Sequence, residues 1–65
     1  MADILPGREI LMEIVRYGNA MRVTAMDVAT TTEIVISVPP GPDQYMKNMA
    51  LKRLEFVLKK KGLIQ

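Results

Sequence analysis

Carboxylate pairs are the first candidates for acid–base chemistry in this chain, because its 65 residues contain no histidine and no cysteine. That composition excludes thiol nucleophiles, Ser-His pairs, histidine acid–base catalysis and the usual zinc ligand sets. Glu9 and Glu13 would share one side of a strand, about 13 Å from each other at about 3.3 Å per residue. This separation is too large for the carboxylate pair of a glycosidase.

The remaining charged residues of the first half have a structural interpretation. Glu9, Glu13 and Glu33 are expected to flank Arg22 on the outer face of a sheet, where cross-strand charge pairs are common. The chain has no Gly-x-Gly-x-x-Gly motif, no Walker lysine loop and no calcium loop. We therefore expect a protein that is not an enzyme, with no catalytic residue, no metal ligand and no cofactor.

Basic charge gathers at the end of the chain. Residues 1–43 carry a net charge of −3, whereas residues 44–65 carry +5. A helix is predicted over this second part, and one side of it combines a stripe of aromatic and methionine side chains with flanking basic rows. The predicted interaction surface consists of Tyr45, Met49, Lys52, Arg53, Phe56, Lys59 and Lys60. Such a surface suits an acidic or apolar protein partner.

This surface has other interpretations. Tyr45 would lie over residues 39–42 and Phe56 over an edge of the sheet, with solvated lysines around them, since single exposed apolar side chains are ordinary. Alternatively, the basic helix would bind nucleic acid weakly, by analogy with small DNA-binding modules. The sheet has more acids than bases and no base-stacking motif, which favours a protein partner. A membrane-surface role is disfavoured, because the core needs the apolar helix face.

The elements that would position these residues follow from the apolar periodicity. Residues 8–17 alternate with period two, which indicates a strand. Gly18-Asn19 is typical of a two-residue hairpin loop and predicts a second strand over residues 20–28. The resulting register places Ile14 opposite Val23, so that the apolar sides of both strands coincide.

The second half of the pattern completes the fold. A β-branched third strand is predicted over residues 33–38, after a loop with an even number of residues, expected to be four. Helix-forming residues run from about 42 to 61, and Gly62 indicates the end of the helix. We predict an α+β fold in which a three-stranded antiparallel sheet of two hairpins packs against one C-terminal helix. Residues 1–65 would form one β-β-β-α domain.

Apolar side chains exceed what one helix and one face of the sheet can bury. The helix face expected to cover the sheet consists of Met46, Ala50, Leu51, Leu54, Val57 and Leu58. The other face of the sheet would leave uncovered Leu11, Val15, Tyr17, Met26 and Val35. We therefore expect self-association about a two-fold axis, helix to helix or sheet face to sheet face, or an unknown protein partner.

Targeting signals are not evident in the sequence. The N-terminus lacks a basic region followed by an apolar stretch, so no secretory signal is predicted. Apolar stretches are broken by charges well before the roughly 20 residues that a membrane-spanning helix needs. We expect a cytoplasmic protein with no membrane partner.

Three segments carry a resemblance to a known family: REILMEIVRYGN at 8–19, VTAMDVAT at 23–30 and ALKRLEFVL at 50–58. Over about residues 8–58 the chain resembles a family of small, uncharacterised bacterial domains, some of which are labelled serine hydroxymethyltransferase. The resemblance implies no activity and no binding residue, and a pyridoxal enzyme of that type needs a far larger fold. It also implies a glycine in the second turn, and Thr31 at that place argues against a positive φ there.

Overall fold

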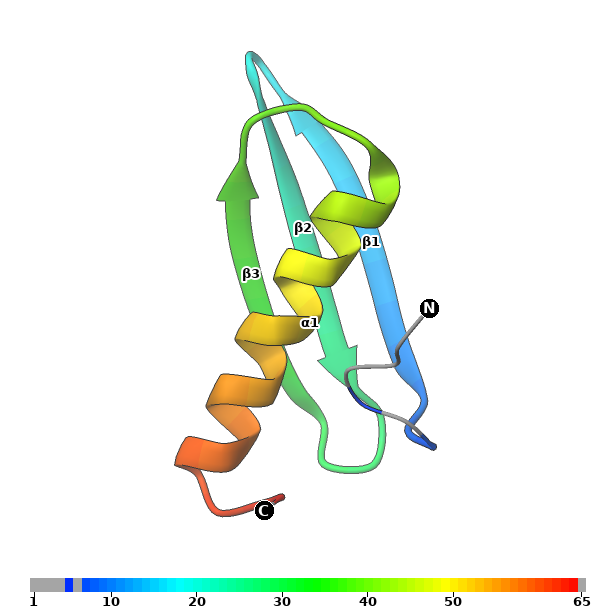
Figure 1. Ribbon diagram of the computed structural model, residues 1–65, viewed down its shortest axis with the longest axis vertical. Helices are drawn as coiled ribbons and strands as arrows, with labels where there is room; N and C mark the ends of the chain where they lie inside the picture. The colour runs from blue at the N-terminus through cyan, green and yellow to red at the C-terminus, as the bar shows by residue number, and fades with distance from the viewer. Residues whose placement is uncertain (1–4, 6, 65) are drawn as a thin grey trace.

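The computed structural model describes Leu5 and residues 7–64, which form three strands and one helix (Figure 1). The elements are β1 (Ile10–Tyr17), β2 (Ala20–Asp27), β3 (Thr32–Val38) and α1 (Asp43–Lys60). The strands form one antiparallel sheet in the order β1-β2-β3, so β1 and β3 are its edges. The α+β fold predicted from the sequence is confirmed.

The first hairpin has the predicted two-residue loop and register. Gly18 adopts a φ of 58°, the left-handed conformation that glycine tolerates without strain. Ile14 pairs with Val23, which brings the apolar sides of β1 and β2 onto one face. β1 begins at Ile10 rather than at the expected residue 8, and the guanidinium of Arg8 is directed to Asp27.

The second hairpin has a loop of four residues, as expected, since Asp27 pairs with Thr32 across it. The carboxylate of Asp27 accepts hydrogen bonds from the backbone N–H of Thr30 at 3.2 Å and from its hydroxyl at 2.7 Å. These bonds fix the loop, and Thr31 completes it with a φ of 54°. The expectation that Thr31 avoids a positive φ was therefore wrong, because the hydrogen bonds between Asp27 and Thr30 hold the loop in this turn.

The Thr31→Gly variant is expected to be more stable than the parent by about 0.5–1 kcal/mol. A left-handed conformation costs a residue with a Cβ about 1–2 kcal/mol, which outweighs the extra freedom that glycine has in the unfolded chain. Urea unfolding at one fixed protein concentration measures the difference. Ala29→Gly is the control, since Ala29 lies in the same loop without a positive φ. Equal losses of unfolding free energy in the two variants would contradict strain at Thr31.

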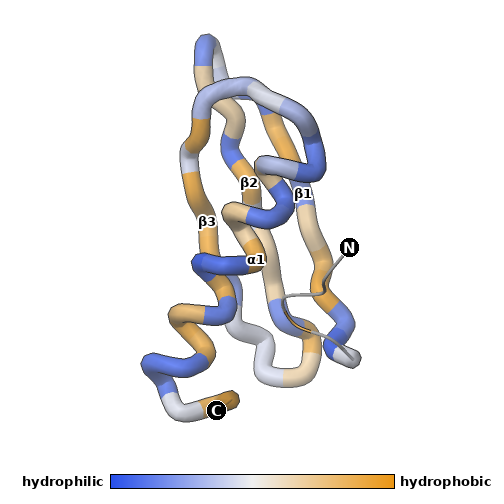
Figure 2. Tube along the Cα trace, viewed as in Figure 1, coloured by the Kyte–Doolittle hydropathy of each residue, from blue (hydrophilic) through white to orange (hydrophobic). Residues whose placement is uncertain are grey.

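The core lies between one face of the sheet and α1. Figure 1 shows α1 crossing that face obliquely, from beside β1 at its start to beyond β3 at its end. Figure 2 shows apolar and polar segments alternating along α1, as expected for a helix with one buried side. The buried apolar residues are Leu5, Val23, Ala25, Ile34, Val38, Met46, Ala50, Leu54 and Leu58. Leu51 and Val57, also expected in this core, are half-buried at its border, and the contribution of Leu5 was not predicted.

The end of α1 follows the sequence signal closely. Gly62 adopts a φ of 74°, and its N–H donates to the carbonyl of Lys59. The N–H of Leu63 donates to the carbonyl of Leu58 at 2.9 Å, which completes a Schellman motif. The helix proper is slightly shorter than the expected 42–61, because Pro42 and Lys61 are its capping residues. Within the described residues, no helix is both long and apolar enough to span a bilayer.

Candidate functional site

The face of the sheet that points away from α1, which we call the outer face, is the largest uncovered surface formed by the strands. It carries Leu11, Glu13, Val15, Tyr17, Arg22, Thr24, Met26, Glu33, Val35 and Ser37. Leu11 is 51% exposed, Val35 55% and Tyr17 58%, while Val15 and Met26 are half-buried between neighbours. Strand alternation places all five apolar residues on this side, as the sequence predicted.

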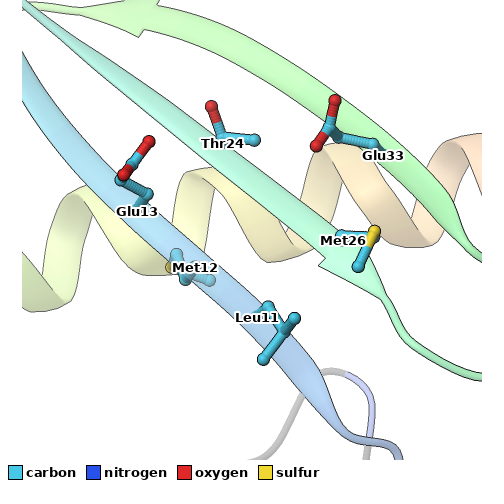
Figure 3. Close-up of a pocket in the computed structure, with 6 residues that line it drawn as sticks. All are labelled: Leu11, Met12, Glu13, Thr24, Met26 and Glu33. Carbon is cyan, nitrogen blue, oxygen red and sulfur yellow. The ribbon is translucent and has the colours of Figure 1, made fainter.

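A shallow hollow lies at one end of the outer face. Leu11, Glu13, Thr24, Met26 and Glu33 stand around it on the side of the sheet away from α1 (Figure 3). Its volume of about 210 Å³ is below the roughly 300–1,000 Å³ of typical small-molecule sites. The hollow is therefore smaller than the usual site of a cofactor or a substrate.

The carboxylates of the outer face do not form a pair. Glu13 and Glu33 come from the two edge strands, and Thr24 and Met26 of β2 lie between them. Arg22 does not bind these glutamates, in contrast to the sequence expectation. Its guanidinium instead lies 4.5 Å from the centre of the Tyr17 ring and donates to the Tyr17 hydroxyl at 3.3 Å.

The surface predicted on α1 is less continuous than expected. Tyr45 and Phe56 are exposed, but Met49 is half-buried and packs against the core. The prediction for Met49 was wrong, because α1 packs over β2 and β3 and its flank at Met49 meets the border of the core. Tyr45 lies beside Gly41, where a Cβ would be 3.8 Å from its Cδ2 atom. This position agrees with the alternative that Tyr45 covers the segment before the helix.

The basic residues of α1 surround its exposed phenylalanine. Arg53 lies 5.3 Å and Lys60 6.0 Å from the centre of the Phe56 ring, as cation–π contacts. Lys52 and Lys59 are exposed as well, and Lys59 forms an ion pair with Glu55 at 3.8 Å. Phe56 is therefore an exposed ring that lies among the basic side chains of α1.

A buried ion pair joins the N-terminal segment to the second hairpin. Asp27 is fully buried, and its carboxylate accepts from Nε of Arg8 at 3.0 Å and from the terminal nitrogen at 2.6 Å. The hydroxyl of Thr32 lies 2.8 Å from that of Thr30 and extends the network. This cluster was not predicted from the sequence, although Asp27 follows Val23 and Ala25 on the core side of β2. A carboxylate at a core position requires a partner.

The environment of Asp27 makes it a structural group rather than an acid or base. Hydrogen bonds from Arg8 and then from Thr30 lower the pKa of Asp27 from 3.8 to about 2. Its oxygens are occupied by these donors, and the carboxylate is closed to solvent. It therefore fixes the hairpin and the N-terminal segment.

This pKa shift predicts acid sensitivity. A pKa that is lower in the folded state means that the ionised carboxylate stabilises the fold. This stabilisation is complete when the pH is above the pKa that the group has in the unfolded chain. The contribution of Asp27 is thus fully present above about pH 4 and is lost as the pH falls towards about 2. The urea concentration at the midpoint of unfolding should therefore fall steadily as the pH is lowered across that range. A midpoint that stays constant between about pH 4 and pH 2 would contradict the assignment.

Comparison with known proteins identifies a family. Neither the curated proteins nor the solved structures contain a match to this chain. One family model matches residues 7–61, in agreement with the expected membership of a family of small domains without an assigned function. The chain belongs to the family described as Domain of unknown function (DUF6898).

Proposed function

We propose that this domain is a non-catalytic interaction module that self-associates through the outer face of its sheet. The observation that carries the proposal is the exposure of Leu11, Tyr17 and Val35, each more than half accessible on one face that no described element covers. Exposed apolar side chains that gather on one face of a small protein commonly mark interfaces. The separation of Glu13 from Glu33 and the closed environment of Asp27 support an absence of catalysis.

The size of the face determines the expected affinity. Three strands of seven or eight residues present about 14 Å by about 25 Å, or about 350 Å² of flat area. Two such faces bury less than the roughly 1,200 Å² at the lower end of stable interfaces. We therefore expect a weak dimer with a dissociation constant of the order of 10 µM or above.

Charge distribution favours the outer face over α1 as the self-association surface. A two-fold axis through the exposed side of α1 would place Arg53, Lys60 and their basic neighbours opposite the same cations of the second copy. The outer face instead carries side chains of both positive and negative charge, so Arg22 of one protomer can meet Glu13 or Glu33 of the other. An interface made of apolar contacts and a few such ion pairs is therefore complementary to itself about a two-fold axis.

The Leu11→Lys variant is expected to weaken the dimer at least tenfold. The two-fold axis brings two lysines into the interface, and each loses hydration there. In the monomer the new lysine would lie beside carboxylates, so the fold should persist. Sedimentation equilibrium from about 5 to about 500 µM, a range that brackets the expected constant, measures the effect.

Phe56→Lys is the matched control, since it makes the same kind of exchange at a residue that is 53% exposed on α1. It should leave the mass distribution unchanged. Dissociation by Phe56→Lys with no effect of Leu11→Lys would move the interface to α1. A wild-type chain that sediments at 7.3 kDa throughout would refute self-association. Association that persists at high salt would agree with apolar contact, whereas binding to phosphates would weaken steeply.

A further inference from the structure

β3 is an edge strand without the usual protection against pairing. It has β2 on one side only, so alternate residues direct their N–H and C=O groups away from the sheet. Natural edges are commonly protected by lysine, proline or bulges. Thr32–Val38 contains neither lysine nor proline, and its only charged residue is Glu33 near its start. This edge can therefore accept a further strand.

One flank of α1 lies beside this edge. Leu51 and Lys47 line a hollow together with Met12 of β1, which places that side of α1 towards β1. Arg53 and Lys60 lie about 160–180° from Leu51 around the helix and therefore on the side of β3. The end of α1 extends beyond β3 in Figure 1, so a strand added to β3 would lie beneath the C-terminal half of the helix.

The flank offers cations that form no ion pair with a carboxylate of residues 5 and 7–64. In the described part of the chain, the ion pairs are those of Arg8 with Asp27 and of Lys59 with Glu55. Arg53 and Lys60 contact the Phe56 ring, and neither belongs to an ion pair of the described residues. Guanidinium and ammonium groups beside an open edge favour carboxylates on whatever pairs with it.

We infer that the β3 edge and this flank of α1 bind an extended acidic segment of a partner protein as a fourth strand. Main-chain hydrogen bonds to β3 would supply affinity, as in other cases of strand addition. The carboxylates of the segment reach Arg53 and Lys60, while its apolar side chains meet Phe56 and the half-buried Val57.

A second copy of this chain fits the edge less well. Two-fold pairing of β3 with another β3 would bring the two α1 flanks side by side. Both flanks carry Arg53 and Lys60, which form no ion pair within the described residues, so cations would meet cations. The charge of the flank thus selects an acidic partner. The inference goes beyond the proposed self-association, because the β3 edge and the outer face are different surfaces.

The experiment uses a fluorescein-labelled peptide of alternating valine and glutamate, with a valine–lysine peptide for comparison. Fluorescence anisotropy is followed with the Leu11→Lys protein, so that self-association does not compete. The acidic peptide should bind and the basic one should not. The double variant Arg53→Gln/Lys60→Gln should weaken binding at least about tenfold. Lys47→Gln/Lys52→Gln removes the same charge elsewhere on α1. This variant should change the affinity for the acidic peptide less than about threefold.

Amide chemical shifts locate the bound peptide. Addition of the acidic peptide should perturb Thr32–Val38 more strongly than β1. Perturbation centred on β1, equal weakening by both double variants, or no binding of the acidic peptide would each overturn the inference. A dimer that Arg53→Gln/Lys60→Gln strengthens would assign the edge to a second copy instead. Failure of Leu11→Lys to alter sedimentation would refute only the outer-face dimer.

Discussion

The Leu54→Ala variant is expected to lose about 2–5 kcal/mol of its free energy of unfolding. Leu54 is fully buried in the middle of α1, where it packs into the core formed with Val23 and Ala25. A domain of this length has a total stability of about 3–10 kcal/mol, at 0.05–0.15 kcal/mol per residue. The cavity therefore removes a large share of the stability.

Urea unfolding followed by circular dichroism measures this loss. Leu63→Ala is the matched control, because it makes the same exchange at a residue that is 46% exposed. It should cost less than about 1 kcal/mol. Equal midpoints for the two variants would show that α1 does not cover the sheet through Leu54.

The Asp27→Asn variant is expected to lose about 2–3 kcal/mol. The amide has the shape of the carboxylate and keeps an oxygen for the Thr30 hydroxyl, but it removes the charge that faces Arg8 at 2.6 Å. One donor of the amide then points at the guanidinium, so a buried hydrogen bond becomes a repulsive contact. The N-terminal segment should detach from the second hairpin.

The control for Asp27→Asn is Glu33→Gln, which makes the same chemical change at an exposed residue of the sheet. It should shift the stability by no more than about 0.5 kcal/mol. The Asp27→Asn variant should also lose the acid sensitivity assigned to this carboxylate between about pH 4 and pH 2. Retention of the full wild-type acid transition in Asp27→Asn would place the titrating group elsewhere.

Local signals were sufficient for the elements of the fold. Gly18-Asn19 set both the loop and the register of the first hairpin, because a shift of one residue would have turned one apolar side outward. Gly62 indicated the end of α1, and its left-handed conformation explains why. The uncovered apolar side of the sheet followed from strand alternation alone.

Features that depend on how the elements pack were not predictable in the same way. A helical wheel places Met49 away from the sheet, but the oblique course of α1 brings it to the border of the core. The pairing of Arg8 with Asp27 joins residues 19 positions apart, and periodicity carries no information about such a contact. The left-handed Thr31 also depends on the Asp27 carboxylate, so it was missed for the same reason.

An isotope-filtered NOE experiment tests the outer face as an interface most directly. Uniformly labelled and unlabelled chains are mixed at a concentration above the dissociation constant, and contacts between protomers are recorded. A dimer formed through the outer face should give cross-peaks that join the methyl groups of Leu11, Val15 or Val35 of one protomer to outer-face protons of the other. Cross-peaks confined to α1, or none in a sample that sediments as a dimer, would contradict it.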